Sequence, residues 1–278
     1  MTLLQILILA IVQGAAELLP VSSSAHVIVA EKLMGLDPTS PQMTLLLVML
    51  HTGTMFAVIV YFWKKWQSTY FSSAQAFRSN ALFLLVATAI TVVVGLFLQE
   101  VIKHVVEHNS PGFEIEQLFG NARLMAAALF GAGVLIIVSS RIKEKGSGEL
   151  TRHSAAVIGA VQGLCLPFRG FSRSGATIST GLALGVSRQR AEEFSFALAV
   201  VLTPAVMGKE VLRLAKAPAE AAAGGLMAAV GPGLIGMVLS FAAGMAALRW
   251  LSSWLEQGRW YLFGGYCLLA SLVVLWVG

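Results

Sequence analysis

Apolar residues dominate most of the chain and form segments separated by short polar stretches. A transmembrane helix needs about 20 mainly apolar residues to cross a hydrocarbon core roughly 30 Å thick. Six segments meet this requirement: 43–63, 80–102, 122–140, 194–214, 225–248 and 259–277. The pattern therefore predicts six transmembrane helices.

Four shorter apolar segments form two pairs, 2–19 with 21–36 and 153–168 with 174–187. Each pair is interrupted by proline or glycine beside polar residues. Irregular backbone at membrane depth is tolerated only where protein or a water-filled cavity satisfies its polar groups. Each pair is therefore predicted to form a re-entrant helix–loop–helix hairpin.

The two halves of the chain resemble each other. Val12-Gln13-Gly14 recurs as Val161-Gln162-Gly163, and a serine-rich turn follows each copy. Each half, about 1–145 and 146–278, contains one hairpin and three spans, and an odd number of spans inverts the second half. The predicted fold is thus an all-α polytopic membrane protein with six transmembrane helices and two re-entrant hairpins in an inverted repeat, forming a single integral membrane domain over 1–278. Such repeats meet near the midplane at sites that handle charged groups.

Composition supports a membrane protein. Only 12% of the residues are charged and 57% are hydrophobic, whereas soluble domains carry roughly 25% charged residues. The net charge of +5 therefore does not indicate nucleic-acid binding, because excess Lys and Arg in membrane proteins lies mainly in cytoplasmic loops. Cys165 and Cys267 lie far apart in apolar segments and predict neither a disulfide framework nor a zinc site.

Basic residues gather in three of the predicted loops. They are Lys64, Lys65 and Arg78, then Arg141, Lys143, Lys145 and Arg152, then Arg249 and Arg259. The positive-inside rule makes these loops cytoplasmic. Both termini are then expected outside, and the first hairpin opens to the exterior.

The first pair of segments contains a polar cluster. Gln13 and Glu17 are four residues apart and share one helix face. A carboxylate at membrane depth needs a cation, a metal or a buried arginine as partner. Glu17 is therefore predicted to be a metal ligand or a general base, the alternative being a structural hydrogen bond to the broken-helix backbone. His51, inside an apolar span, is interpreted as a core residue, the alternative being a side chain that faces the cavity.

The residues from Pro20 to His26 read as a turn followed by a helix start. Ser22 and Ser23 can cap that helix, and its free backbone N–H groups attract phosphate. One serine is predicted to bind phosphate or to act as a nucleophile. His26 is a candidate nucleophile, acid or base, the alternative being a satisfied core histidine.

A second cluster spans Gly170 to Thr177, within Gly170-Phe171-Ser172-Arg173-Ser174-Gly175-Ala176-Thr177. Arg173 supplies a planar, permanently charged fork suited to phosphate oxygens. The hydroxyls of Ser172, Ser174 and Thr177 add donors, so the segment predicts an oxyanion cradle. Arg169 is either a second phosphate contact or an interfacial anchor.

These motifs closely resemble those of the undecaprenyl-pyrophosphate phosphatase family, also called the BacA or bacitracin-resistance family, and the resemblance covers nearly the whole chain. Residues 13–17 resemble its E/Q-x-x-x-E motif, residues 20–26 its P-V-S-S-x-x-H motif, and residues 170–177 its G-x-S-R-S-G-x-T motif. Together, at this separation and within this hydropathy pattern, the three motifs are highly specific.

The resemblance implies a multi-pass enzyme of the bacterial cytoplasmic membrane. Such an enzyme hydrolyses undecaprenyl pyrophosphate to undecaprenyl phosphate and inorganic phosphate at the periplasmic or outer side. This regenerates the lipid carrier for peptidoglycan synthesis and confers bacitracin resistance. The resemblance also implies a divalent cation, Mg²⁺ or Ca²⁺, and membrane lipid and a polyprenyl pyrophosphate as partners, with no nucleic acid.

Carried over by motif, the catalytic residues are Glu17, Ser23, His26 and Arg173, with Glu17 also the metal ligand. The expected substrate-binding residues are Gln13, Ser22, Ser172, Ser174, Thr177 and Arg169. The nucleophile is left open among Ser23, His26 and an activated water. The prenyl chain length, the metal and the oligomeric state, a homodimer included, are open as well.

Two positions depart from the family pattern. Phe168 and Arg169 separate Pro167 from Gly170, where the family usually has Pro-Gly, and Ala25 stands where the family often has Gly. The insertion adds a cation next to the predicted cradle and bears on substrate choice. The alternative function is a transporter or flippase of a prenyl phosphate or related lipid anion, which would move its substrate without releasing phosphate.

Overall fold

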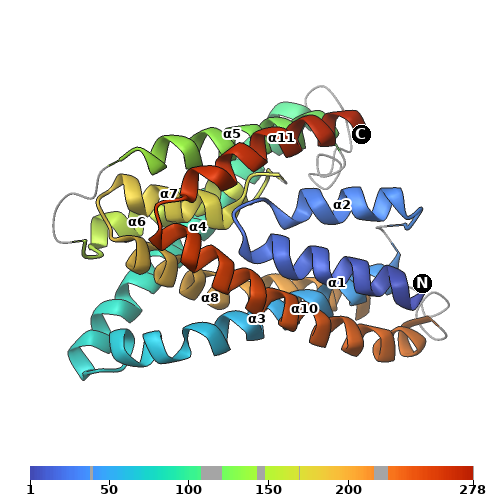
Figure 1. Ribbon diagram of the computed structural model, residues 1–278, viewed down its shortest axis with the longest axis horizontal. Coiled ribbons are helices and arrows are strands. Elements are labelled where there is room, and N and C mark those ends of the chain that lie inside the picture. The colour runs from blue at the N-terminus through green and yellow to red at the C-terminus, as the bar shows by residue number, and fades with distance from the viewer. Residues whose placement is uncertain (38–39, 108–120, 143–147, 169, 216–224, 278) are drawn as a thin grey trace.

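The computed structural model describes residues 1–37, 40–107, 121–142, 148–168, 170–215 and 225–277. Within these ranges the chain forms ten helices (Figure 1). They are α1 (Leu3–Leu18), α2 (Ser23–Leu33), α3 (Pro41–Tyr70), α4 (Ala74–Glu107), α5 (Ala122–Ser140), α6 (Arg152–Cys165), α7 (Arg173–Ala183), α8 (Arg188–Ala215), α10 (Gly225–Glu256) and α11 (Trp260–Val277). The all-helical prediction is confirmed.

Five of the described helices are long and apolar enough to cross a membrane: α3, α4, α5, α10 and α11. They identify the chain as a multi-pass membrane protein. The sixth predicted span, 194–214, lies within α8, where several side chains fall outside the described set. That span stays a prediction.

The two predicted hairpins are present as helix pairs. We call α1, the following turn and α2 the first hairpin, and α6, the following loop and α7 the second hairpin. Both begin with a capping box: Thr2 and Gln5 bond each other's backbone N–H groups, and Thr151 and Ser154 do the same. Each box satisfies two N–H groups that a helix start leaves unpaired, so the same local device begins both hairpins.

The glycine of each repeated tripeptide marks a close helix contact. A Cβ on Gly14 of α1 would lie 2.7 Å from the Ser240 carbonyl oxygen of α10. A Cβ on Gly163 of α6 would lie 2.9 Å from the Thr91 carbonyl oxygen of α4. Real side chains do not approach backbone oxygens this closely, so glycine is what lets each hairpin pack against a long helix.

The tips of the two hairpins meet in the middle of the molecule (Figure 1). Ser174 at the start of α7 donates a hydrogen bond to the Leu19 carbonyl oxygen after α1, at 3.3 Å. Cys267 of α11 donates to the neighbouring Pro20 carbonyl oxygen, at 3.2 Å. These bonds satisfy part of the irregular backbone that the hairpin turn exposes.

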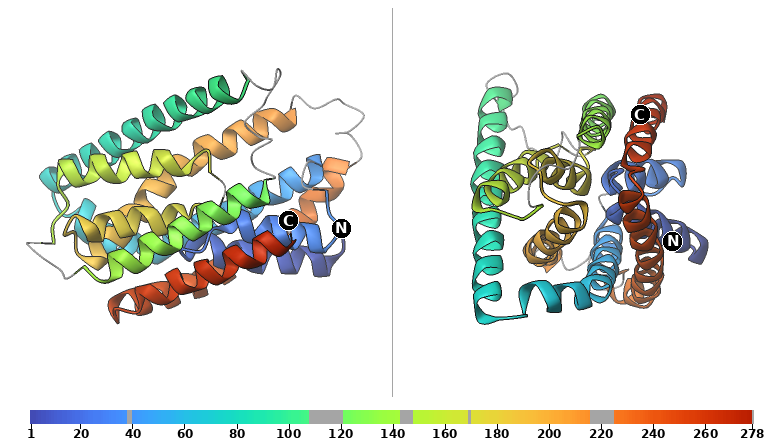
Figure 2. Two further views of the ribbon diagram at one scale, coloured as in Figure 1. Left: turned by 90° about the horizontal axis from the view of Figure 1, so that it is seen from above. Right: turned by 60° about the vertical axis from the view of Figure 1, so that its left-hand side comes forward.

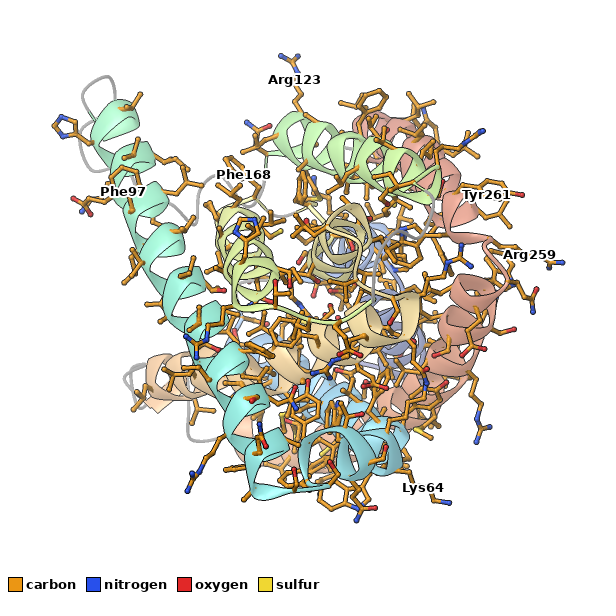
Figure 3. All side chains as sticks on the ribbon, turned by 90° about the vertical axis from the view of Figure 1, so that its left-hand side faces the viewer. Lys64, Phe97, Arg123, Phe168, Arg259 and Tyr261 are labelled. Carbon is orange, nitrogen blue, oxygen red and sulfur yellow. The ribbon has the colours of Figure 1, made fainter. Side chains whose placement is uncertain are left out.

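The basic loops lie at one end of the bundle. The α3–α4 turn, the end of α5 and the α10–α11 turn are on the left of Figure 1, and both termini are on the right. Figure 3 views that left-hand end, and the side chains of Lys64 and Arg259 extend away from the bundle there. Helix α4 lies at the periphery (Figure 2), and its Phe97 points outward, 69% exposed, as expected of a lipid-facing side chain.

Candidate functional site

Glu17, in the last turn of α1, connects the two polar clusters. Its Oε2 accepts hydrogen bonds from Ser23 Oγ at 2.6 Å and from Gln13 Nε2 at 3.3 Å. Its Oε1 accepts one from Arg173 Nη2 at 3.1 Å, across 156 residues of sequence. The Glu17 side chain is only 18% exposed. The structure therefore brings three of the residues expected from the sequence onto the carboxylate of a fourth.

His51 of α3 is a fifth member of this site. Its Nε2 lies 3.7 Å from Glu17 Oε2, and its Nδ1 lies 2.8 Å from the Leu47 carbonyl oxygen. The side chain is 36% exposed, so the interpretation of His51 as a core residue is wrong. Nothing near it in the sequence marks it, because its partner comes from another helix. We call Gln13, Glu17, Ser23, His51 and Arg173 the Glu17 cluster.

The turn before α2 is strained at Ser22. This residue has φ of 67°, the only positive value among the described non-glycine residues, and left-handed backbone there costs a residue with a Cβ of order 1–2 kcal/mol. Its side chain makes no capping hydrogen bond to α2, although the sequence predicts a serine cap. The first N–H groups of α2 are thus left without a side-chain cap, beside Ser23 and Glu17.

His26 lies one turn further along α2, and both of its ring nitrogens are engaged. Nδ1 lies 2.8 Å from the Ser22 carbonyl oxygen and Nε2 lies 2.6 Å from the hydroxyl of Tyr266 on α11. The structure therefore places His26 beside the Glu17 cluster rather than in it. Tyr266 was not a candidate from the sequence, where it resembles the aromatic residues of any membrane helix.

The hydroxyls of the second hairpin make contacts within the protein. Ser172 caps α7 by accepting from Gly175 N at 3.2 Å, and Ser174 donates to Leu19 O as described above. Thr177 Oγ1 lies 2.8 Å from Arg173 O and 2.6 Å from Ser195 Oγ. All three hydroxyl-bearing residues are buried. They hold the start of α7 in place and thereby position Arg173.

Arg173 projects from that fixed helix start toward Glu17. Its side chain is 21% exposed. One guanidinium nitrogen, Nη1, is buried without a hydrogen-bond partner in the described part of the chain. A buried donor without a partner costs about 1–3 kcal/mol, so an anionic ligand that accepts from Nη1 would recover that cost. The other cation predicted here, Arg169, lies outside the described residues.

A resident metal does not fit the side chains alone. Across the described ranges, no three His, Cys, Asp or Glu side chains come together as metal ligands. Glu17 is the single carboxylate of its cluster, and both its oxygens already accept hydrogen bonds. Mg²⁺ is often bound by one or two carboxylates plus the phosphates of a ligand. The donor set therefore fits a cation that arrives with a phosphorylated ligand, which would supply most of the oxygens.

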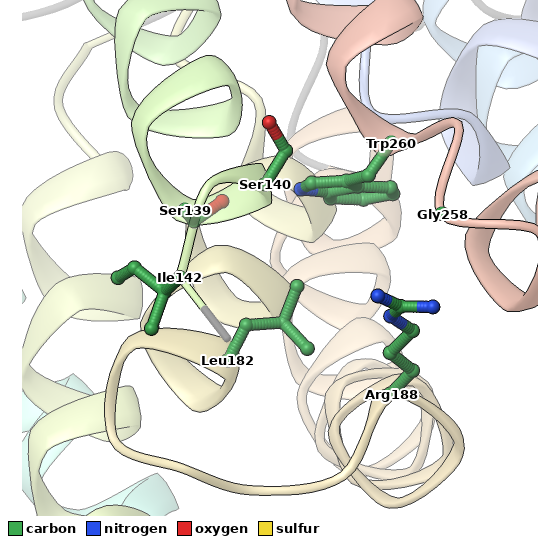
Figure 4. A pocket seen from close by; sticks show the side chains of 7 residues that line it. All are labelled: Ser139, Ser140, Ile142, Leu182, Arg188, Gly258 and Trp260. Atoms are coloured by element: carbon green, nitrogen blue, oxygen red, sulfur yellow. The ribbon is translucent and has the colours of Figure 1, made fainter. Parts of the chain in front are cut away.

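Two cavities lie away from this cluster. One, of about 10 Å³, is at the far end of α7 from Arg173, between Leu182, Arg188 and Trp260 (Figure 4). It is large enough for about one water molecule. The other, of about 430 Å³, is lined by residues of α3, α4 and the start of α8, among them Asn80 and Glu193. No residue of the Glu17 cluster lines either one.

Comparison with known proteins gives a consistent result. Residues 6–273 match the family model described as "Bacitracin resistance protein BacA". "Undecaprenyl-diphosphatase 2" of Acinetobacter baylyi is 64% identical over 99% of this chain and 98% of its own length. A protein named "Undecaprenyl-diphosphatase" from Acidiphilium cryptum is 34% identical over 97% of this chain and 95% of its own length. Another of the same name, from Korarchaeum cryptofilum, is 31% identical over 99% of this chain and 99% of its own length.

Proposed function

Because the chain belongs to the BacA family of bacitracin resistance proteins, we propose that it hydrolyses undecaprenyl diphosphate to undecaprenyl phosphate and inorganic phosphate. The observation that carries the mechanism is the pair of contacts on Glu17. Ser23 Oγ donates to one carboxylate oxygen at 2.6 Å, and Arg173 donates to the other at 3.1 Å. The proposed base thus contacts both the proposed nucleophile and the proposed phosphate-binding cation.

In the first step, Ser23 is the nucleophile and Glu17 the base. Glu17 takes the hydroxyl proton as Ser23 Oγ forms a bond to the terminal phosphorus. The bond from that phosphorus to the bridging oxygen breaks, and the bridging oxygen leaves with its electron pair as undecaprenyl phosphate. A base held within hydrogen-bonding distance of a serine is the usual way of activating its otherwise weak hydroxyl nucleophile.

In the second step, water releases the phosphate. The proton on Glu17 is first lost to the leaving group or to solvent. Glu17 then takes a proton from a water molecule that attacks the phosphoserine, and the Oγ–phosphorus bond breaks. Inorganic phosphate leaves and Ser23 regains its proton. The net reaction consumes one water and regenerates both side chains.

Arg173 and the first N–H groups of α2 bind the terminal phosphate. The free Nη1 of Arg173 can donate to a phosphate oxygen while Nη2 remains near Glu17. The first N–H groups of α2 carry no side-chain cap and add donors and the positive end of a helix dipole. Phosphoryl transfer depends mainly on such positioning and charge stabilisation.

A divalent cation, Mg²⁺ or Ca²⁺, belongs to the proposal as a partner of the diphosphate. It would neutralise charge on both phosphates, with Glu17 as its one carboxylate ligand from the cluster. Arg173 and His51 of the protein already lie 3.1 and 3.7 Å from the Glu17 carboxylate oxygens, so the divalent cation would bring most of its oxygen ligands with it.

The proposed setting is the bacterial cytoplasmic membrane, with α8 as a sixth span and both hairpins re-entrant. The gathering of the three basic turns at one end of the bundle supports placing that end in the cytoplasm. The first hairpin then opens outward from the midplane, so its site faces the periplasmic side and the prenyl tail stays in lipid. The product would serve as the carrier for peptidoglycan synthesis.

The test is phosphate release from undecaprenyl diphosphate by the purified protein in detergent, with Mg²⁺ or Ca²⁺ and then with EDTA. Ser23→Ala and Arg173→Ala are the test variants. Ser24→Ala, whose side chain lies about 100° further around α2, and Arg123→Ala, whose arginine points away from the bundle in Figure 3, are the matched controls.

We expect cation-dependent release that Ser23→Ala and Arg173→Ala abolish and the controls retain. Full activity in Ser23→Ala would transfer the role of nucleophile to water or to His26. A folded, monodisperse protein that releases no phosphate would contradict the proposal. Movement of a prenyl phosphate across vesicle membranes without hydrolysis would then favour the transporter alternative.

A further inference from the structure

Tyr266 of α11 and His26 of α2 form a contact that the hydrolysis mechanism above does not use. The Tyr266 hydroxyl lies 2.6 Å from His26 Nε2, and the two rings stack with centroids 5.6 Å apart and planes 15° from parallel. Tyr266 is 46% exposed on a helix that otherwise consists almost wholly of apolar residues.

The surroundings of His26 define where its proton lies. Nδ1 is 2.8 Å from the Ser22 carbonyl oxygen, and a carbonyl oxygen only accepts hydrogen bonds, so Nδ1 carries the proton. In the neutral ring Nε2 is then an acceptor, and the Tyr266 hydroxyl is its donor. The lone pair that an attacking imidazole would use is therefore occupied.

The contacts form a continuous chain that ends at Ser23. Tyr266 donates to His26, and His26 donates to the carbonyl oxygen of Ser22. Ser22 is the residue with the strained φ of 67°, and it directly precedes Ser23. Strained backbone persists only where the surroundings hold it. The Ser22 carbonyl oxygen accepts from the His26 backbone N–H at 3.4 Å and from the imidazole at 2.8 Å, so the imidazole is the closer of its two donors.

We propose that Tyr266 is a positioning residue: through His26 it holds the strained Ser22 turn so that the Ser23 hydroxyl points at Glu17. The inference rests on the proposed function and deepens it, since it assigns His26 to bracing the turn and leaves nucleophilic attack to Ser23. It gives α11, far along the chain, a direct effect on the reacting serine.

The chain offers a close control for the tyrosine. Tyr261 lies on the same helix and is 47% exposed. Tyr266→Phe and Tyr261→Phe each remove one hydroxyl and keep the ring. We expect Tyr266→Phe to lower kcat about tenfold with KM within about twofold, as expected for loss of positioning in the transition state, and Tyr261→Phe to leave both unchanged.

His26→Asn separates bracing from attack. The amide nitrogen of asparagine can occupy the place of Nδ1 and donate to the Ser22 carbonyl oxygen, but it has no atom in the place of Nε2. We expect His26→Asn to retain much more activity than His26→Ala. In the His26→Asn background, adding Tyr266→Phe should cost nothing further, because the two changes remove the same contact.

The contact between Tyr266 and His26 can also be measured directly, from the ¹⁵N signals of the histidine ring. In protein labelled with ¹⁵N at its five histidines, the signals missing from His26→Asn identify His26. We expect a proton on Nδ1 in the unmodified protein and a changed Nε2 signal in Tyr266→Phe only. An unchanged Nε2 signal in Tyr266→Phe would show that the contact is not made and would overturn the proposal.

The kinetic outcomes are equally decisive. Wild-type kcat in Tyr266→Phe, a rise in KM alone, or phosphate trapped on His26 would each overturn the positioning role while leaving the proposed hydrolysis intact. If the unmodified protein released no phosphate, the proposed function would fail and the positioning role with it. The ¹⁵N spectrum would then still report whether Tyr266 and His26 are in contact.

Discussion

The two hairpins begin alike and end differently. Both start with a capping box, and the glycine of the repeated tripeptide packs each against a long helix. At the tips they diverge. The first hairpin turns through Ser22 and leaves α2 without a side-chain cap, whereas the second turns through Gly170 at φ 107° and caps α7 with Ser172.

This difference separates two tasks. The first hairpin presents the partly exposed Glu17 and Ser23, the proposed reactive groups, at a strained turn. The second buries its hydroxyls in internal hydrogen bonds and presents one cation, Arg173. A largely buried carboxylate and guanidinium are costly apart and stabilise each other together, so each hairpin supplies the charge that the other needs.

The largest expected effect comes from the reactive groups of the first hairpin. Glu17→Gln keeps the size of the side chain and removes the proposed base, and Ser23→Ala removes the proposed nucleophile. We expect each to lower the rate of phosphate release by about 10³-fold or more. The double variant should be little worse than either single one, since the two residues act in one step. Effects that multiply would mean that they act independently.

The cation of the second hairpin comes next. Arg173→Lys keeps the charge but loses the planar fork, so we expect roughly a 10²-fold loss of kcat/KM, comparable to losing one preorganised donor to a transition-state oxyanion. Arg123→Lys is the control. Near-wild-type activity in Arg173→Lys would mean that only charge matters at this position.

The turns of the two hairpins are expected to differ in which substitutions they tolerate. A Cβ on Gly170 would lie 2.3 Å from the Met125 carbonyl oxygen, so Gly170→Ala should destabilise the protein by about 2 kcal/mol or more. Ser22→Gly removes the strain and should be neutral or stabilising, by up to about 1 kcal/mol. Thermal unfolding in detergent measures both. A destabilised Ser22→Gly would show that the hydroxyl supports the turn.

The smallest effect distinguishes the two glutamines of the repeat. Gln13 donates to Glu17 at 3.3 Å, whereas the buried Gln162 donates to Thr91 on α4 at 3.4 Å. Gln13→Leu should lower kcat roughly fivefold, the equivalent of about 1 kcal/mol for one hydrogen bond. Gln162→Leu should leave kcat unchanged. Equal effects would remove the functional distinction between the hairpins.

The hydropathy pattern and the turn residues were sufficient to predict where the helices of this protein lie. Segment 122–140 coincides with α5, and the broken pairs became the two hairpins. The long helices extend past their apolar segments, α3 to Tyr70 and α10 to Glu256, because a helix continues into polar residues that hydropathy excludes. The inverted repeat and its two halves stay predictions.

The candidate site was predicted in part. The four-residue spacing of Gln13 and Glu17 correctly placed both on one face, and the second motif contains Arg173, which contacts Glu17 in the structure. The sequence favoured core packing over a cavity position for His51 and did not single out Tyr266, because each is a single residue in an apolar helix whose partner lies on another helix. It also could not show that Ser172, Ser174 and Thr177 bond within the protein.

By itself, then, the sequence determined the class of the protein, its helices and its family, since these depend on local composition, helical period and motifs. Only the tertiary structure decided which groups share Glu17, which hydroxyls are buried, and that a tyrosine near the end of the chain contacts His26. Residues 17 and 173 are 156 positions apart, and nothing in either segment fixes that distance. Packing of one hairpin tip against the other does.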